Sequence, residues 1–152
     1  MKTIEAVWDA YLKKYNLPKT TPFCGECTFG SDKEENAIVT AMVLSGQKQA
    51  NCAALESYQI DMEPIPEKGN RYVVTDIRGN ALCVIEIEKV SVLPFTDITW
   101  EMAKKESAAP RMSIWEERQR DFLEYDAEIM GYEFTPDISI VFEEFRVVYI
   151  VP

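Results

Sequence analysis

Apolar residues recur every three to four positions along residues 3–15, which predicts an amphipathic helix that ends at the following Asn-Leu-Pro. Its expected apolar face consists of Ile4, Val7, Trp8, Tyr11, Leu12 and Tyr15. A second helix is expected to begin at Ser31, the first residue of a Ser-x-x-Glu capping box, and to stop at Gly46. Its expected buried stripe consists of Ala37, Ile38, Ala41, Met42 and Leu44.

Four other runs have the β-branched and aromatic composition of strands. The clearest are 71–77 and 81–93, which are separated by Arg-Gly-Asn, a hairpin turn in which Gly79 can take a positive φ. A weaker strand is expected over 50–57, and a last strand is expected over 137–151.

Two further helices are expected between these strands. A short one is predicted over 96–107, with Asp97 or Thr99 as its N-cap. A longer one follows a second capping box, Ser-Ile-Trp-Glu at 113–116, and ends at Gly131. Because the strands follow one another through hairpins and are decorated by short helices, we expect an α+β domain built on a small, mostly antiparallel sheet or barrel.

The length and composition are those of one ordinary globular domain. The chain has 152 residues, 47% of them hydrophobic, and no low-complexity spacer, so we expect a single domain over residues 1–152. Residues 1–16 carry Glu5, Asp9, Lys13 and Lys14 and have no uninterrupted apolar core. This stretch fits neither a secretory signal nor a membrane span, so we expect a cytoplasmic protein without membrane partners.

The charge balance and the absence of histidine exclude several classes of function. Sixteen basic and twenty-six acidic residues give a net charge of −10, which argues against nonspecific coating of DNA or RNA. The chain contains no histidine, so Ser-His-Asp, Cys-His and His-ligated metal chemistry are excluded. Any proton transfer must use Lys, Asp, Glu, Tyr or Cys.

The four cysteines do not form a recognisable metal set. Cys24 and Cys27 make one CxxC, whereas Cys52 and Cys83 lie far apart in sequence. A zinc site or a redox pair at this CxxC is a weaker alternative to ordinary reduced cysteines, with Cys83 buried in a strand. We therefore expect no metal and no cofactor, and the role of the Cys24 and Cys27 pair stays open.

Several segments taken together resemble one known family. They are FGSDKEENAIVTAMVLSGQKQAN, GNRYVVTDIRGNALCVIEIEKVSVLPFTDIT, MAKKES, SIWEERQRDF and FEEFRVVY. In this order they resemble the ASCH family, whose fold is PUA-like. The core of the resemblance covers 26–150, and residues 1–25 form a helical extension and loop. Its best single element is Gly46, then Lys48, then Asn51 at a position where the family normally has a small hydroxyl residue.

The resemblance implies a ligand beside this lysine. Family members are generally inferred to act on RNA, nucleotides or coenzyme-like ligands, and some small members resemble amidohydrolases that deacylate an acylated cytidine. Carried over by position, the catalytic set is Lys48, Asn51 and Glu106. Asn51 departs from the pattern because an amide is a poor nucleophile. Ser107 and Gln119 depart as well, since many larger members have glycine and histidine there.

Each candidate residue also has an ordinary structural explanation. Lys48 lies just past a helix C-terminus, which favours a cation by itself. Glu106 fits a solvated helix end, and Asn51 could cap a turn as well as it could contact a base edge. Trp115 could stack on a base or lie in the core, and Arg111 could add positive potential or belong to a solvated helix face.

The sequence thus predicts a binding module for a nucleotide, a nucleoside or a short RNA, in a cleft centred on Lys48. Its expected ligand-binding residues are Gly46, Lys48, Asn51, Arg111 and Trp115. The alternative is an amidohydrolase acting on an N-acylated nucleoside, with Lys48 as general base and Glu106 stabilising the developing charge. Ribonuclease activity is a third reading, and the oligomeric state is left open.

Overall fold

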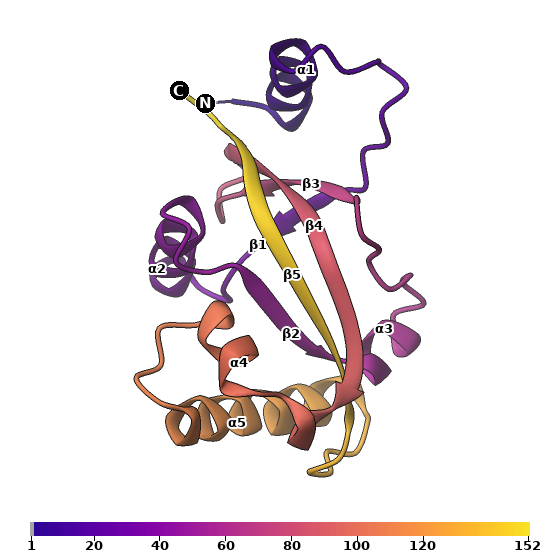
Figure 1. Ribbon diagram of the computed structural model, residues 1–152, viewed down its shortest axis with the longest axis vertical. Coiled ribbons are helices and arrows are strands. Elements are labelled where there is room, and N and C mark those ends of the chain that lie inside the picture. The colour runs from indigo at the N-terminus through magenta and orange to yellow at the C-terminus, as the bar shows by residue number, and fades with distance from the viewer. Residues whose placement is uncertain (1) are drawn as a thin grey trace. The chain divides into compact units, whose positions relative to one another are not determined.

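The computed structural model describes residues 2–152, which form a mixed α+β fold (Figure 1). In chain order the elements are α1 (Ile4–Lys14), β1 (Glu26–Thr28), α2 (Lys33–Leu44), β2 (Ala50–Ala54), α3 (Leu55–Ile60), β3 (Arg71–Thr75), β4 (Ala81–Pro94), a 3-10 turn η1 (Phe95–Asp97), α4 (Trp100–Glu106), α5 (Met112–Met130) and β5 (Ser139–Ile150). The predicted α+β class is confirmed.

The strands form one five-stranded sheet in the order β1-β3-β4-β5-β2. The β3–β4 and β2–β5 pairs are antiparallel, whereas β1 pairs with β3 in parallel. A parallel pair needs a crossover connection, and the long path from Thr28 to Arg71 through α2, β2 and α3 supplies it. Strands β1 and β2 therefore occupy the two ends of this order.

The chain divides into two compact units. Unit 1 comprises Met1–Lys48, Lys68–Glu88 and Phe145–Pro152, and unit 2 comprises Gln49–Glu67 and Lys89–Glu144. Strands β4 and β5 each contribute residues to both units. The single domain expected from the sequence stays a prediction.

In unit 1, helix α1 packs against β3. The shared core consists of Val7, Tyr11, Leu12, Val73, Ala81 and Val84. Thr3 is the N-cap, and its hydroxyl accepts a hydrogen bond from the amide of Ala6 at 3.1 Å. Tyr15 was expected on the buried face but is 49% exposed, because it is the C-cap residue and lies beyond the last helical turn.

The β3–β4 hairpin is confirmed, and its turn is organised by one carboxylate. Oδ1 of Asp76 accepts hydrogen bonds from the amides of Arg78 and Asn80, each at 2.9 Å. Gly79 has a φ of 88°, the left-handed conformation expected for it. The strands that this turn joins follow the predicted ranges closely because their β-branched runs end at strong turn residues.

Both capping boxes expected from the sequence are wrong. The N-cap of α2 is Asp32, whose Oδ1 accepts from the amide of Glu35 at 2.8 Å, while Ser31 Oγ instead donates to the carboxylate of Glu35 at 3.0 Å. Helix α5 has Arg111 as its N-cap, with no side-chain bond to the first turn. Ser113, expected as that cap, lies inside the helix and accepts from Arg111 Nε at 3.1 Å.

The buried stripe of α2 differs from the expected one by a rotation of the helix. Ile38 was expected in the core but is 58% exposed. The buried positions are Asn36, Thr40 and Val43, of which two are polar. A hydrophobic pattern cannot identify a face that buries an amide and a hydroxyl, which explains the wrong stripe.

The buried amide of Asn36 has backbone partners on two different segments. Its Nδ2 donates to the carbonyl oxygen of Phe29 at 2.7 Å, and its Oδ1 accepts from the amide of Ile77 at 3.1 Å. Burial of an amide is tolerated when its hydrogen bonds are made. Asn36 therefore joins α2 to the loop before it and to the hairpin turn.

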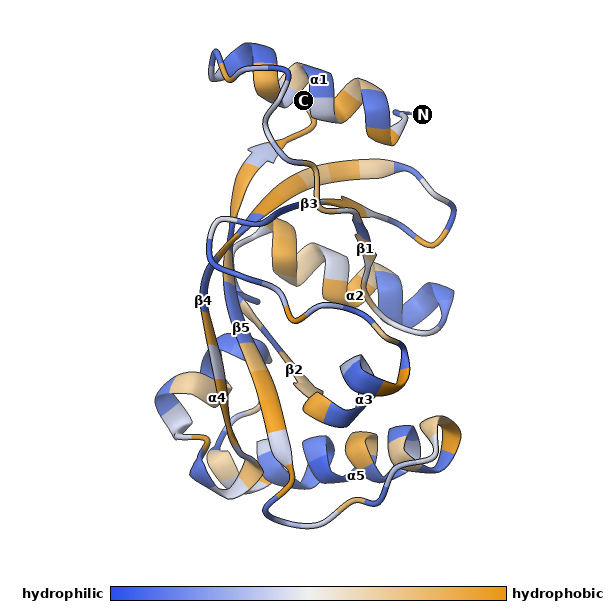
Figure 2. Cartoon of the chain, turned by 90° about the vertical axis from the view of Figure 1, so that its right-hand side faces the viewer, coloured by the Kyte–Doolittle hydropathy of each residue, from blue (hydrophilic) through white to orange (hydrophobic). Residues whose placement is uncertain are grey.

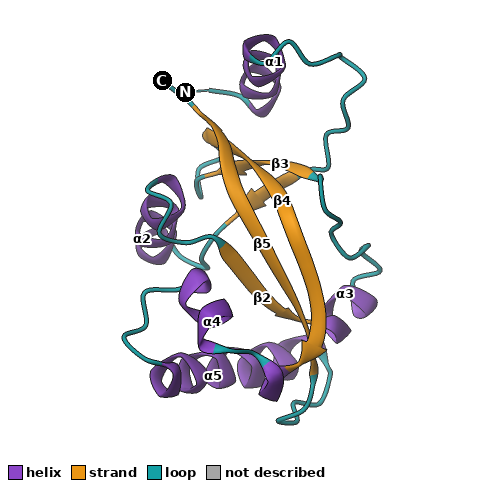
Figure 3. Ribbon diagram, in the orientation of Figure 1, coloured by secondary structure: helices purple, strands orange, loops and turns teal. Residues whose placement is uncertain are grey.

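In unit 2, helix α4 packs against β2 and against α5 (Figure 3). The core there consists of Ala50, Ala54, Phe95, Ile98, Ala103, Ala109, Trp115, Leu123, Ile138, Ile140 and Phe142. The predicted N-cap of α4 is confirmed at Thr99, whose hydroxyl accepts from the amide of Met102 at 3.3 Å.

Hydrophobic residues occur in short runs along the elements. In β5 the hydrophobic residues 140–142 are followed by Glu143 and Glu144, and in Figure 2 helix α5 alternates between hydrophilic and hydrophobic residues along its length. Within residues 2–152, no helix is long and apolar enough to cross a bilayer. The cytoplasmic location stays a prediction.

Gly30→Ala should destabilise the fold more than Gly69→Ala. Both glycines have positive φ, 82° and 92°, so each alanine costs about 1–2 kcal/mol of backbone strain. A Cβ on Gly30 would also lie 2.7 Å from the backbone nitrogen of Asn36, whereas nothing lies within 4 Å of one on Gly69. We expect at least about 1 kcal/mol of additional loss at Gly30. Equal midpoints in urea unfolding would contradict the close approach.

Cys83 should be unreactive in the folded protein and should make its stability sensitive to alkaline pH. Its side chain is 0% exposed, and burial raises the pKa of the thiol from 9.0 to about 12. A thiol reagent at neutral pH should label the exposed Cys24 and should reach Cys83 only after denaturation.

The pKa of this thiol is 9.0 in the unfolded chain and about 12 in the folded protein. Below pH 9.0 the thiol is protonated in both states, so ionisation of Cys83 does not lower the free energy of unfolding. As pH rises from 9.0 towards 12, the unfolded thiol ionises first, and the free energy of unfolding falls by up to about 1.4 kcal/mol per pH unit. Urea unfolding of wild type and Cys83→Val between pH 8 and 11 isolates this contribution. Parallel stability curves for the two proteins would rule it out.

Candidate functional site

Burial distinguishes two charged residues from the others. Among the charged side chains of residues 2–152, Lys48 and Glu106 are the two that are buried, with 7% and 8% of their surface exposed. Lysine and glutamate are rarely buried without compensating contacts. These two residues belong to the catalytic set that the family resemblance implied.

Lys48 is positioned by the end of α2. Ser45 is the C-cap, and Gly46 follows with a φ of 79°, which confirms the stop expected there. The amide of Lys48 then donates to the carbonyl of Met42 at 3.0 Å, so the backbone folds back onto the last helical turn. Gly46 itself is exposed, and its positive φ allows the chain to turn at this point.

The ammonium of Lys48 lies against an aromatic ring. Its Nζ is 6.0 Å from the ring centroid of Phe29, within reach of a cation–π interaction. A lysine that only complemented the helix dipole would extend into solvent. Its burial therefore favours a role in a site over the surface role considered from the sequence.

Glu106 is the last residue of α4 and is held by α5. Nε2 of Gln119 donates to Oε1 of Glu106 at 2.7 Å. The expectation of a solvated helix end is therefore wrong. The sequence identified Gln119 only as a departure from the family pattern, because nothing local shows that residues 106 and 119 meet where α4 packs on α5.

Asn51 is paired across two strands. It lies opposite Glu143 in the antiparallel β2–β5 register, and its Nδ2 donates to Oε1 of Glu143 at 3.1 Å. The amide thus orients a carboxylate, which fits the expectation that Asn51 can bind or orient groups but cannot act as a nucleophile. Sequence reasoning missed Glu143, because the register of strands far apart in the chain has no local signal.

A second carboxylate lies next along this edge of unit 2. Glu144 stands opposite Ala50 in the register, and its Oε1 is 2.6 Å from Nζ of Lys105. The carbonyl of Lys105 accepts from the amide of Gln49 at 2.7 Å, which ties the end of α4 to the start of β2. Because successive residues of a strand point to opposite faces, Glu144 and Lys105 lie on the other face of the sheet from Glu143 and Asn51.

Two other predicted ligand-binding residues have structural roles. Trp115 is 0% exposed and packs against Phe95, with 6.0 Å between ring centroids. It offers no exposed ring face on which a base could stack, so its position favours the core role. Arg111 is exposed and donates to Ser113 at the start of α5.

Comparison with known proteins assigns the fold and the family. The ASCH domain model matches residues 25–149. Protein EF3133 from Enterococcus faecalis has a similar structure, with a TM-score of 0.85 and 26% identity over 97% of this chain and 88% of that chain. An ASCH domain from Lactobacillus crispatus gives a TM-score of 0.84 and 27% identity over 95% and 93% of the two chains. Among curated proteins no match was found. Because the family model covers most of the sequence, this chain belongs to the ASCH domain family.

Proposed function

We propose that this protein binds a base-bearing ligand, which is a nucleotide, a nucleoside or a short RNA. Lys48 supplies positive charge to that ligand, and Glu106 accepts a hydrogen bond from it. Membership of the ASCH family supports the ligand class, because this family is generally thought to bind RNA. Binding, without hydrolysis, is the function proposed.

The burial of two opposite charges carries the proposal. Lys48 and Glu106 are 7% and 8% exposed, and removing such groups from water opposes folding. A fold that only needed stability would be served as well by apolar side chains at these positions. Charged groups in partly dehydrated surroundings interact strongly with polar ligands, which gives their burial a functional reason.

The acceptors of unit 2 favour recognition of a base over recognition of phosphate. Glu106 and Glu143 are held by the amides of Gln119 and Asn51, so their carboxylates are oriented before a ligand arrives. Carboxylates accept hydrogen bonds from exocyclic amino groups such as that of cytosine. A net charge of −10 further disfavours ligands with many phosphates.

Hydrolysis of an N-acylated nucleoside is the alternative that the resemblance implied. It would use Lys48 as general base and Glu106 to stabilise developing charge. Asn51 donates its amide to Glu143 at 3.1 Å and offers no hydroxyl, so a bound water would have to be the nucleophile. Chromatography after incubation with an N-acylated cytidine separates the two functions, because a hydrolase cleaves the amide with water to give cytidine and a carboxylic acid, whereas a binding module leaves the compound intact.

Lys48→Met should weaken binding of cytidine, cytidine monophosphate or a short single-stranded RNA by about 10- to 150-fold. This range follows from the loss of one charge-assisted hydrogen bond, about 1.5–3 kcal/mol. Titration calorimetry measures the dissociation constants. The matched control is Lys104→Met on α4, whose lysine is 47% exposed and pairs with Glu101 at 2.8 Å. The control should bind like wild type.

A double-mutant cycle tests whether Lys48 and Glu106 serve the same ligand. Lys48→Met, Glu106→Gln and the double variant should show a coupling energy above about 0.5 kcal/mol in ligand affinity. Additive losses would assign the two residues to separate roles. If the folded wild type binds none of the ligands, or if Lys48→Met binds them unchanged, the proposal fails.

Gln119 should act as a positioning residue for Glu106. Gln119→Met removes the 2.7 Å donor to a buried carboxylate, so we expect a loss of about 1–3 kcal/mol in unfolding free energy and weaker ligand binding. Gln119→His keeps a ring N–H that can donate and should restore binding. If Gln119→His binds the ligand like wild type and Gln119→Met binds it more weakly, residue 119 acts through its hydrogen bond to Glu106 and not only through packing. Equal affinities for the two variants would exclude that role.

A further inference from the structure

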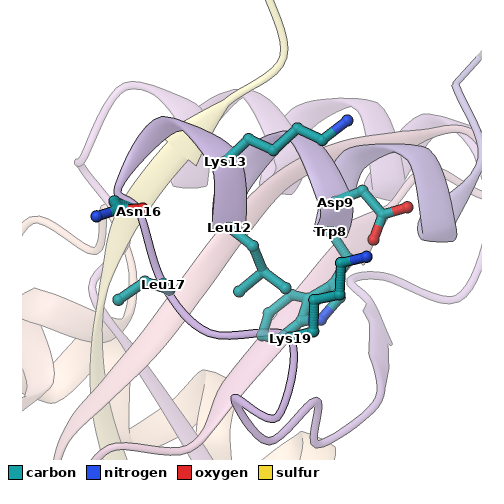
Figure 4. Close-up of a pocket in the computed structure, with 7 residues that line it drawn as sticks. All are labelled: Trp8, Asp9, Leu12, Lys13, Asn16, Leu17 and Lys19. Carbon is teal, nitrogen blue, oxygen red and sulfur yellow. The ribbon is translucent and has the colours of Figure 1, made fainter.

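A hollow of about 480 Å³ lies beside helix α1, outside the segment that matches the family model (Figure 4). Its lining residues are Trp8, Asp9, Leu12, Lys13, Asn16, Leu17 and Lys19. All of them belong to unit 1 and to the N-terminal extension. The volume is within the range of about 300–1,000 Å³ typical of small-molecule sites.

The apolar part of this hollow is held firmly in place. Leu12 is 6% exposed and packs in the unit 1 core, and the amide of Leu17 donates to its carbonyl at 2.8 Å. The indole of Trp8 is in edge contact with Phe23 at 5.3 Å and tilted against Tyr11 at 5.4 Å. Trp8 is nevertheless only partly buried, so part of its indole is available to a ligand.

The rim carries two cations in a strongly acidic protein. Lys13 and Lys19 are exposed on it, together with Asp9 and Asn16, which gives the hollow a local charge of +1 against −10 for the chain. Lys13 is in the last turn of α1, where the helix dipole already favours a cation. Lys19 lies in the loop beyond the helix and is exposed.

We propose that this hollow binds a mononucleotide, or one nucleotide unit of an RNA, independently of Lys48. The base stacks on Trp8, as bases do on aromatic platforms, and Leu17 covers its edge. Lys13 and Lys19 contact the phosphate. The amide of Asn16 offers both a donor and an acceptor to the base edge, and the carboxylate of Asp9 accepts from a ribose hydroxyl. These four polar groups are exposed and hydrated without a ligand, so the choice of a nucleotide rests on the indole of Trp8 and the two nearby lysines.

Adenosine monophosphate is the probe, and the indole N–H signal of Trp8 in ¹H–¹⁵N spectra is the readout. The signal is assigned by its loss in Trp8→Leu. Adenosine monophosphate should shift it saturably, adenosine should do so with lower affinity, and inorganic phosphate alone should not shift it. The double variant Lys13→Gln and Lys19→Gln should lower the affinity for adenosine monophosphate by at least about tenfold and leave the affinity for adenosine unchanged.

The control is Lys33→Gln, which removes an exposed lysine from the first turn of α2 and should leave the titration as in wild type. Lys48→Met should also leave the Trp8 response intact, so failure of one site is distinguishable from failure of the other. No shift of the Trp8 signal at millimolar nucleotide overturns the proposal. Loss of that response in Lys48→Met overturns the independence of the hollow.

Discussion

The hydrogen bonds of the buried Asn36 amide determine how α2 is set in unit 1. One amide binds the carbonyl of Phe29 at 2.7 Å and the amide of Ile77 at 3.1 Å, so it fixes the loop before α2 and the hairpin turn together. These two hydrogen bonds fix the orientation of α2 about its own axis. That orientation directs the chain after α2 so that Lys48 lies 6.0 Å from the ring of Phe29. The buried amide and the buried lysine thus share Phe29 as a neighbour, one at its carbonyl and the other at its ring.

The sequence predicted the parts of the fold that are determined locally. The β3–β4 hairpin followed from two β-branched runs and Gly79, and the ends of α2 and α5 followed from Gly46 and Gly131. The buried face of α2 could not be predicted, because Asn36 breaks the hydrophobic pattern for the sake of two distant hydrogen bonds. The parallel β1–β3 pair was equally hidden, since strand partners separated by a crossover have no local signal.

The candidate site shows the same division between local and nonlocal information. Lys48 and Glu106 were found through the family resemblance, yet each one taken alone fitted a solvated helix end. Their burial is a tertiary property and required the structure. Glu143, the partner of Asn51, was missed, and Gln119, the partner of Glu106, was identified only as a departure from the family pattern, because both pairings join different elements.

The charge of the site limits what its ligand can be. In unit 2, Glu106 and Glu143 are the carboxylates that side-chain amides orient, whereas Glu144 lies on the other face of the sheet and is 2.6 Å from Lys105. Each phosphate that binds lysine or arginine releases counterions and steepens the dependence of affinity on salt. If Lys48 is the one buried cation of residues 2–152 that contacts the ligand, as proposed, it can make at most a few such contacts. On that proposal, most of the specificity comes from amino and hydroxyl donors on the ligand, whose hydrogen bonds are nearly indifferent to salt. The net charge of −10 agrees with this part of the proposal, because it disfavours a ligand with a long phosphate backbone.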